Sequence, residues 1–545
     1  MALLNTTEEV AAELEARHSF LVEAGAGSGK TTTLVRALQH LLDNQRSSLA
    51  SHGKKIACIT YTNVAKNNIR KRVNADPIVD VSTIHEFLWK SIQQYQSHLW
   101  DQIKIYSKEL GNPEDLDDVA APEEIVYSNR DSELSEGRIS HDDVIRLSLL
   151  LAENHPKLIR IIADKYPFIF VDEYQDTSPE TIELLLDHLA VTGQQKCVVG
   201  LFGDSMQKIY DSGVGEVHRP GLLAEITKYE NYRCSPPVVD VLNRIRPELP
   251  QIAVGDQQEG EVHLFLNTGI QAGPDRLTAA EKTLEKSGWD WDSCKYLLLT
   301  HKKIASTLEY ANLLKEYERS PHRREGLTTR NEPYIQYFTR VEGLCSSFHT
   351  SDFAELNRLL GEKKSHITHH SHKRAIRESL EKLDSVRMNG TIGDVLDLMS
   401  DEHLLSMPGK LKVLERRRNA TGLDEQHQRL ADFSNNLRNV PYLEVIKALE
   451  FIDELTPFST QHGTKGEEFE NVVVVVDDTS WNRYNIGNMI AGTDKNPERT
   501  KRSRNLFYVC CSRARKGLAV VFINDIPEKA KATLRDWFAS GTIHP

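Results

Sequence analysis

Ala24-Gly25-Ala26-Gly27-Ser28-Gly29-Lys30-Thr31 is the stretch of sequence that decides the fold. The apolar residues Phe20 to Glu23 in front of it predict a strand, and the residues from Lys30 to about Leu42 predict a helix. A glycine-rich turn between a strand and a helix presents backbone N–H groups to phosphates. The strict pattern has a glycine where Ala24 stands, but GSGKT is intact. We therefore expect a nucleoside triphosphate to bind through Gly25, Gly27, Ser28, Gly29, Lys30 and Thr31.

A second strand ends in two carboxylates. Phe168 to Val171 is an apolar run, and Asp172 and Glu173 follow it directly. An acid at the carboxyl end of a parallel strand can hold Mg²⁺, so Asp172 and the hydroxyl of Thr31 are the predicted metal ligands. Glu173 is then the candidate to orient and deprotonate the attacking water.

Further apolar runs predict an α/β fold with two parallel sheets. Ile56 to Thr60 and Cys197 to Phe202 belong with the strands already named. A second set follows at Val262 to Leu266, Tyr296 to Thr300, Val472 to Val476 and Leu518 to Phe522. We predict one core from residues 1–87 and 161–235 with a helical insertion at 88–160, and a second core from residues 236–314 and 451–545 with a helical insertion at 315–450.

Composition narrows the class of protein. The chain has 545 residues, of which 39% are hydrophobic, so it can bury several cores. The sequence contains no apolar run long enough to cross a membrane, no signal peptide and no CxxC pair among its seven cysteines, so we expect a cytoplasmic protein with no membrane partner. The 67 basic and 79 acidic residues give a net charge of −12, so any contact with nucleic acid must be local.

Several motifs occur in the order found in the UvrD/Rep-type superfamily 1 DNA helicases. Asp172 to Thr177 (DEYQDT) resembles the second motif of that family, and Thr460 to Phe469 matches TxHxxKGxEF. The remaining similar segments are Thr60 to Asn63 with Ala65 and Arg72, Thr83 to Phe87, Gly203 to Tyr210, Asn231 to Cys234, and Tyr508 to Ala514. The resemblance implies two RecA-like cores that bind ATP and Mg²⁺ between them.

The resemblance also implies roles for residues outside the phosphate loop. Arg233 and Arg513 are similar to the family's arginine fingers, which stabilise charge on the γ-phosphate. Gln207 resembles the γ-phosphate sensor, Tyr232 the residue that stacks on adenine, and Glu468 the ribose contact. The positions similar to strand-contacting residues are Thr62, Asn63, Thr83, His85, Thr460 and His462, and Tyr61 and Tyr210 could stack on bases.

The sequence departs from the family pattern at two places. Glu8 stands where the family has a glutamine that reads adenine, and an ionised carboxylate only accepts hydrogen bonds. Ser212 and Gly213 stand where the family commonly has a tryptophan and an arginine that grip single-stranded DNA. We therefore expect weaker selectivity for adenine and a weaker grip on the strand.

In size and in these departures the chain resembles the helicase-like component of Gabija antiphage systems. That resemblance implies an OLD-family nuclease as partner. The leading hypothesis is an ATP-dependent translocase or helicase on single-stranded or tailed duplex DNA, with 3′ to 5′ polarity implied by the family. Two alternatives remain open: a DNA-sensing ATPase that gates a partner nuclease without processive unwinding, and a stand-alone DNA repair helicase.

Overall fold

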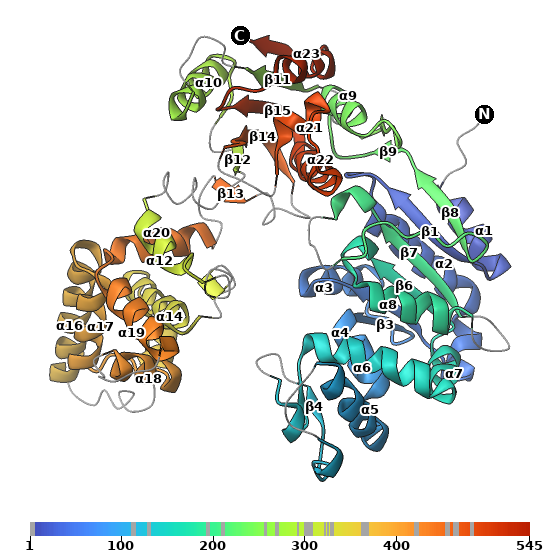
Figure 1. Ribbon diagram of the computed structural model, residues 1–545, viewed down its shortest axis with the longest axis horizontal. Helices are drawn as coiled ribbons and strands as arrows, with labels where there is room; N and C mark the ends of the chain where they lie inside the picture. Colours follow the sequence, from blue (N-terminus) through green and yellow to red (C-terminus); the bar gives the residue numbers. More distant parts are fainter. Residues whose placement is uncertain are drawn as a thin grey trace. The chain divides into compact units, whose positions relative to one another are not determined.

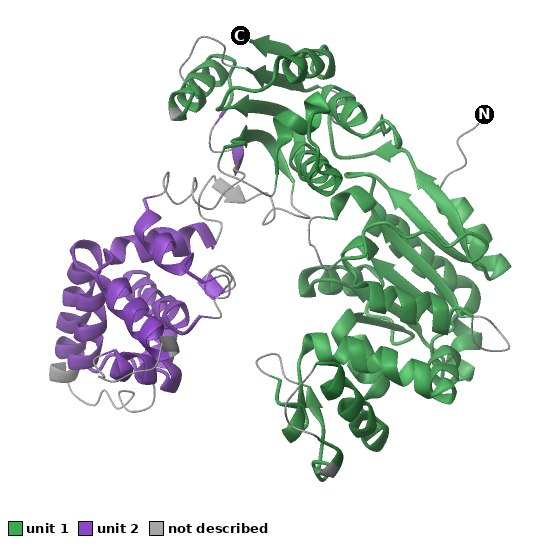
Figure 2. Cartoon of the chain, viewed as in Figure 1, with its two compact units in different colours: residues 1–289, 465–545 green, residues 290–464 purple. Residues whose placement is uncertain are grey.

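In the computed structural model the chain forms two compact units (Figure 2). The larger unit comprises residues 1–289 and 465–545, and the smaller one residues 290–464. The structure describes residues 6–110, 116–127, 132–191, 197–208, 213–255, 259–266, 272–290, 294–298, 309–320, 323, 326–327, 332–360, 370–418, 425–452, 458–460, 468–479 and 484–545.

The first sheet of the larger unit is parallel throughout, with strand order β3-β2-β6-β7-β1-β8 (Figure 1). Its strands are β1 (Ser19–Ala24), β2 (Ile56–Thr60), β3 (Val79–Thr83), β6 (Phe168–Asp172), β7 (Val198–Gly203) and β8 (Leu223–Lys228). The four central strands are those predicted from apolar runs, because both faces of this sheet are covered. The edge strands β3 and β8 were not predicted.

Helices cover both faces of the first sheet. Helices α1 (Thr6–Ala16) and α2 (Lys30–Ser51) pack on the face that carries Phe20, Phe170 and Phe202. Helices α4 (Ile84–Ile92), α5 (Gln96–Glu109), α6 (His141–Asn154) and α7 (Pro156–Lys165) enclose the opposite core, which includes Leu21 and Val171. The described residues between 88 and 160 are mostly helical, with two short strands, β4 (Val126–Tyr127) and β5 (Arg138–Ile139), paired in parallel.

The larger unit contains a second group of parallel strands. These are β14 (Phe469–Val476), β15 (Ala514–Phe522), β11 (Glu261–Phe265) and β16 (Thr542–His544), in that spatial order. The helices of this core are α9 (Pro236–Ile245), α10 (Pro274–Lys286), α21 (Ile486–Ala491), α22 (Pro497–Cys511) and α23 (Glu528–Trp537). The α/β class with parallel sheets is therefore confirmed, whereas the six residue ranges assigned to the two cores and two insertions stay predictions.

The smaller unit is mainly helical. Its described helices are α12 (Ala311–Tyr317), α14 (Pro333–His349), α15 (Phe353–Leu360), α16 (His370–Asn389), α17 (Ile392–Asp401), α18 (Gly409–Arg417), α19 (Glu425–Arg438) and α20 (Tyr442–Ile452). It also contains the parallel pair β12 (Cys294–Leu298) and β13 (Phe458–Thr460). None of the described helices in either unit is long and apolar enough to span a membrane.

Candidate ATP site and nucleic-acid contacts

The phosphate loop joins β1 to α2 at the carboxyl edge of the first sheet. Gly27 and Gly29 have positive φ angles of 74° and 78°, which glycine adopts without strain. A Cβ on Gly27 would lie 2.7 Å from Asn231 Oδ1, and one on Gly25 would lie 2.6 Å from the side chain of Gln251. Gly25 and Gly27 therefore also leave room for the segment that contains Asn231 and Gln251 and leads into the second core.

Two buried side-chain oxygens in or beside this loop have no hydrogen-bond partner among the described residues. The Thr31 hydroxyl donates to Asp172 Oδ2 at 3.3 Å, so the predicted metal ligands from two different elements lie together. Asp172 Oδ1 and Ser28 Oγ are buried and have no hydrogen-bond partner in the described part of the chain. A buried polar atom without a partner is costly. The site therefore fits a bound cation at Asp172 and a phosphate near Ser28.

Burial, followed by the charge of Glu173, raises the pKa of Asp172 to about 7, although Lys30 and Thr31 act to lower it. A bound divalent cation would offset both effects, because a positive charge favours the ionised carboxylate.

Glu173 has a strained backbone at the end of β6. Its φ of 55° and ψ of 48° lie in the left-handed region, where residues other than glycine are uncommon. The Nε2 of Gln175 donates to Glu173 Oε2 at 2.6 Å and so fixes the carboxylate. Strain of this kind persists only where the surroundings hold it, and it gathers at functional sites. The role of Glu173 as general base stays a prediction.

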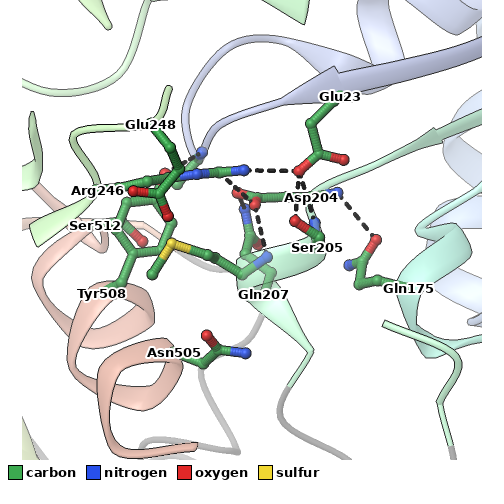
Figure 3. A network of polar contacts seen from close by, with 12 residues as sticks. Glu23, Gln175, Asp204, Ser205, Gln207, Arg246, Glu248, Asn505, Tyr508 and Ser512 are labelled. Atoms are coloured by element: carbon green, nitrogen blue, oxygen red, sulfur yellow. Dashed lines mark hydrogen bonds and ion pairs between the residues drawn. The ribbon is translucent and has the colours of Figure 1, made fainter. Parts of the chain in front are cut away.

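Gln207 lies between the two cores of the larger unit. Its Nε2 donates to Asp204 Oδ2 at 2.8 Å, and its Oε1 accepts from Arg513 Nη2 at 3.4 Å. Asp204 and Gln207 follow β7 of the first core, whereas Arg513 lies between α22 and β15 of the second. Figure 3 shows Gln207 within the polar network at this junction. A ligand that forms a hydrogen bond with the Gln207 amide would therefore change a contact made by each core.

The structure brings Arg233 and Arg513 together. Burial and then the positive charge of Arg233 lower the pKa of Arg513 to about 10. Arg233 donates to Glu468 Oε2 at 2.7 Å and to the carbonyl of Ser512 at 3.2 Å. An anion bound near both guanidinium groups would offset the repulsion between their charges. Glu468 therefore contacts Arg233 here, and its role as ribose contact stays a prediction.

Tyr232 presents an exposed ring beside the phosphate loop. It is 52% exposed, and its Cδ2 lies 3.8 Å from the position of a Cβ built on Gly29. Lys228 Nζ lies 5.6 Å from the ring centroid. An exposed aromatic face next to phosphate-binding backbone is available for stacking on a base.

Comparisons with known proteins agree with this geometry. Residues 7–213 match the family model described as an AAA domain, and residues 414–522 match the viral superfamily 1 RNA helicase core domain. The chain is 24% identical to the Gabija protein GajB of Bacillus cereus, in an alignment that covers 98% of this chain and 96% of that protein. It is also 29% identical to the ATP-dependent DNA helicase PcrA of Staphylococcus aureus over 259 residues, which are 38% of this chain and 34% of PcrA.

These findings support the resemblance of this chain to the UvrD/Rep-like superfamily 1 helicases. The predicted enzyme class, a DNA-dependent ATPase or DNA helicase, is confirmed by these similarities.

Four polar residues near the ATP site of the helicase were not singled out from the sequence. The hydroxyl of Tyr508 accepts the backbone N–H of Ala26 at 3.0 Å, and the side chains of Asn231 and Gln251 both donate to the carbonyl of Ala26. Arg246 contacts Asp204 and Glu23. Asn231 and Tyr508 lie inside quoted motifs and could have been found there, but Gln251 and Arg246 carry no such signal.

Five of the predicted DNA-contacting residues lie at the carboxyl ends of β2 and β3 or directly after them. Thr62 caps α3 (Asn63–Arg72) by accepting the N–H of Ala65, and Thr83 caps α4 together with Glu86. Tyr61, Thr62 and Asn63 are exposed, whereas Thr83 and His85 are half-buried. These residues share one edge of the sheet. Tyr210 and His462 lie outside the described residues, as does the side chain of Thr460.

His85 is packed against the insertion. Its ring stacks on that of His141 in α6 with centroids 4.3 Å apart. Burial, and then the proximity of His141, lower the pKa of His85 to about 4, although Asp142 acts in the opposite direction. His85 is therefore a neutral hydrogen-bonding group at neutral pH, and a contact with a phosphate would not depend on its charge.

Proposed function

We propose that this helicase is an ATP-driven motor that moves 3′ to 5′ on single-stranded DNA and acts in antiphage defence together with an OLD-family nuclease. The observation that carries the motor is the position of Gln207, which contacts Asp204 of one core and Arg513 of the other. Similarity to GajB over nearly the whole chain supports the defence role. The polarity rests on resemblance to the UvrD/Rep family.

In this proposal each residue of the ATP site has a separate role in ATP hydrolysis. Lys30 and the amides of the phosphate loop bind the phosphates, and Tyr232 stacks on the base. Glu173 takes the proton from the attacking water. Arg233 and Arg513 stabilise charge on the γ-phosphate. Thr31 and Asp172 would hold Mg²⁺, which supplies further positive charge at the phosphates.

In this proposal, movement depends on whether a γ-phosphate is bound near Arg513 and Arg233. With a γ-phosphate present, the two arginines have an anion to share, and closure of the cores is favoured. After hydrolysis and phosphate release the shared anion is lost, so closure is no longer favoured. The strand-contacting residues near Thr62 and Thr83 lie on the first core, so alternate opening and closing would move the second core along the strand.

ATP hydrolysis measured with and without single-stranded DNA tests the proposed activity. We expect turnover to rise when a single strand is added, and to be absent in Glu173→Gln under both conditions. The Glu183→Gln variant, which changes an exposed glutamate on α8 (Pro179–Glu183), is the matched control and should behave as wild type. Turnover that is insensitive to single-stranded DNA would overturn the proposal of a motor.

The geometry at Gly213 favours a second candidate, an ATPase that senses DNA and gates the nuclease without processive unwinding. A Cβ on Gly213 would lie 2.4 Å from the carbonyl oxygen of Gln175 and 3.0 Å from Asp176 Cα. The backbone leaves no room there for the arginine that the family commonly uses. Losing an aromatic stack as well, at Ser212, would weaken the grip by ~1 to 3 kcal/mol.

Unwinding assays distinguish the two candidates. A 3′-tailed duplex is given to the purified helicase alone and then with the proposed partner nuclease. Strand separation by the helicase alone supports the motor. DNA-stimulated hydrolysis with no strand separation, together with ATP-dependent cleavage by the added nuclease, supports the gating ATPase.

A further inference from the structure

Arg246 is a buried charge at the junction of the two cores. It is 3% exposed and stands directly after α9. Its Nη1 donates to Asp204 Oδ1 and its Nη2 to Glu23 Oε1, both at 2.6 Å (Figure 3). Its guanidinium carbon lies 5.6 Å from the centroid of the Tyr508 ring. One guanidinium therefore joins two acids and an aromatic ring from three separate elements.

Arg246 is anchored to the second core. Helix α9 packs against β11, β15, α22 and α23, which all belong to that core. Arg504 of α22 fixes the end of α9, because it donates to the carbonyl of Ile245 and to Glu248. Tyr508, on the same helix, holds the N–H of Ala26 in the phosphate loop. Arg246 and Tyr508 are thus two contacts made by the second core on the nucleotide site of the first.

The two acids that Arg246 contacts, Glu23 and Asp204, also form hydrogen bonds with residues near the ATP site. Glu23 stands in β1, and its carboxylate accepts the N–H and O–H of Ser205 and the hydroxyl of Tyr174. Asp204 accepts the N–H of Met206 and the side-chain amide of Gln207. A shift of the Gln207 amide toward a γ-phosphate therefore acts on Asp204, and through Asp204 on Arg246.

We infer that Arg246 is a positioning residue that transmits the state of the ATP site to the second core through Asp204 and Glu23. The inference rests on the proposed function, because it assumes that nucleotide drives closure of the two cores. When the cores close, Arg246 neutralises both acids. When they separate, all three charges must find other partners, so the contact is made or broken as a unit.

The charge balance supports a switching role over a packing role. Burial alone would lower the pKa of Arg246, but Asp204, Tyr508 and Glu23 together raise it well above its ordinary value. Replacing a buried ion triad by apolar side chains often leaves stability unchanged or increases it, whereas removing one member is costly. A contact that only had to hold the cores together would be served equally well by apolar residues.

The test uses Arg246→Lys, which keeps the charge but cannot reach both carboxylates with a planar fork. Three quantities are measured on the full chain: affinity for ATP, thermal unfolding, and the ratio of ATP turnover with and without single-stranded DNA. We expect ATP affinity within about twofold of wild type. The DNA-stimulated ratio should fall by about tenfold. Arg244→Lys is the matched control, because Arg244 is an exposed arginine of the same helix, and it should change none of these quantities.

A second readout needs no DNA. Hydrogen exchange in α9 and α22 is compared with and without a non-hydrolysable ATP analogue. Wild type should gain protection in both helices, and Arg246→Lys should lose that gain. If wild type gains protection but shows no stimulation by DNA, the motor proposal fails while the Arg246 inference stands. If Arg246→Lys keeps both the stimulation and the protection, the inference is overturned.

Where Arg246→Lys does not fold, Glu23→Gln serves instead. The glutamine keeps an acceptor for Ser205 but removes the charge that Arg246 neutralises. The same loss of DNA stimulation with ATP affinity retained supports the inference. Loss of ATP affinity in step with thermal stability would indicate a purely structural contact and overturn it.

Discussion

Replacing Glu173 by Gln removes one proton acceptor and leaves the rest of the ATP site in place. The two side chains have nearly the same shape. The introduced glutamine can turn its amide oxygen toward Gln175 Nε2, which in the wild-type protein donates to Glu173 Oε2 at 2.6 Å. Thr31, Asp172 and Lys30 are unchanged. The substitution therefore isolates the proton transfer from the binding of nucleotide.

The expected size of the effect follows from general-base catalysis. Such a base contributes about 10² to 10⁴ in rate, which corresponds to about 3 to 5 kcal/mol in the barrier. Binding should move in the opposite direction, because Glu173 raises the pKa of Asp172. Without that negative charge Asp172 ionises more readily, so affinity for the complex of ATP and Mg²⁺ should be kept or increased.

The assay pairs steady-state ATP hydrolysis with equilibrium binding of a fluorescent ATP analogue. Lys30→Ala is the contrasting variant, which should lose binding because the phosphates lose their cation. The Glu183→Gln control should resemble wild type in both measurements. Equal losses of ATP affinity in Glu173→Gln and Lys30→Ala, or near-normal turnover in Glu173→Gln, would refute the role given to Glu173.

Three further predictions follow from the site. Replacing Arg513 by Ala should lower ATP turnover by about 10³ or more, with a smaller effect on nucleotide affinity, and Lys should restore it only in part; wild-type turnover in the Lys variant would contradict this. Glu8, exposed in the first turn of α1, should give weak discrimination between ATP and GTP, which Glu8→Gln should sharpen; complete rejection of GTP by wild type would show that adenine is read elsewhere. Because His85 has a lower pKa in the folded state (about 4) than its ordinary value of 6.5, the unfolded chain binds the proton first, and thermal stability should fall as pH drops from 6.5 toward 4. His85→Asn should make that fall shallower, and an unchanged pH profile would argue against a buried neutral histidine.

The central strands of the first sheet could be predicted because they are apolar on both faces. β2, β6 and β7 are buried along their whole length, and the predicted apolar runs match them to within a residue. The edge strands β3 and β8 were missed because neither is buried along its whole length and each contains polar residues, such as Asp80 in β3 and Glu225 in β8. An edge strand is covered on one side only, and its sequence carries a weaker signal.

Helix α2 extends to Ser51, well beyond the predicted end near Leu42. Residues 43–48 are polar, and the apolar spacing that indicated the helix ends before them. The helix continues through this polar stretch and buries Leu49 beyond it, because a solvent-facing stretch needs little apolar spacing once the first turns are packed on the sheet.

The candidate site could be predicted where chemistry is local in sequence. The loop at Lys30 and the pair Asp172 and Glu173 each lie within a few residues, so their strand and turn context identifies them. The triad of Glu23, Asp204 and Arg246 joins segments up to 223 residues apart. No pattern around Arg246 distinguishes it from other arginines, and only the fold brings it to the two acids.

The most direct test of the central claim is displacement of streptavidin from biotin at either end of a single-stranded oligonucleotide during ATP hydrolysis. A motor moving 3′ to 5′ should displace streptavidin from the 5′ end much faster than from the 3′ end, and Glu173→Gln should displace it from neither. Equal rates at both ends, faster displacement from the 3′ end, or no displacement despite DNA-stimulated hydrolysis would contradict directional movement.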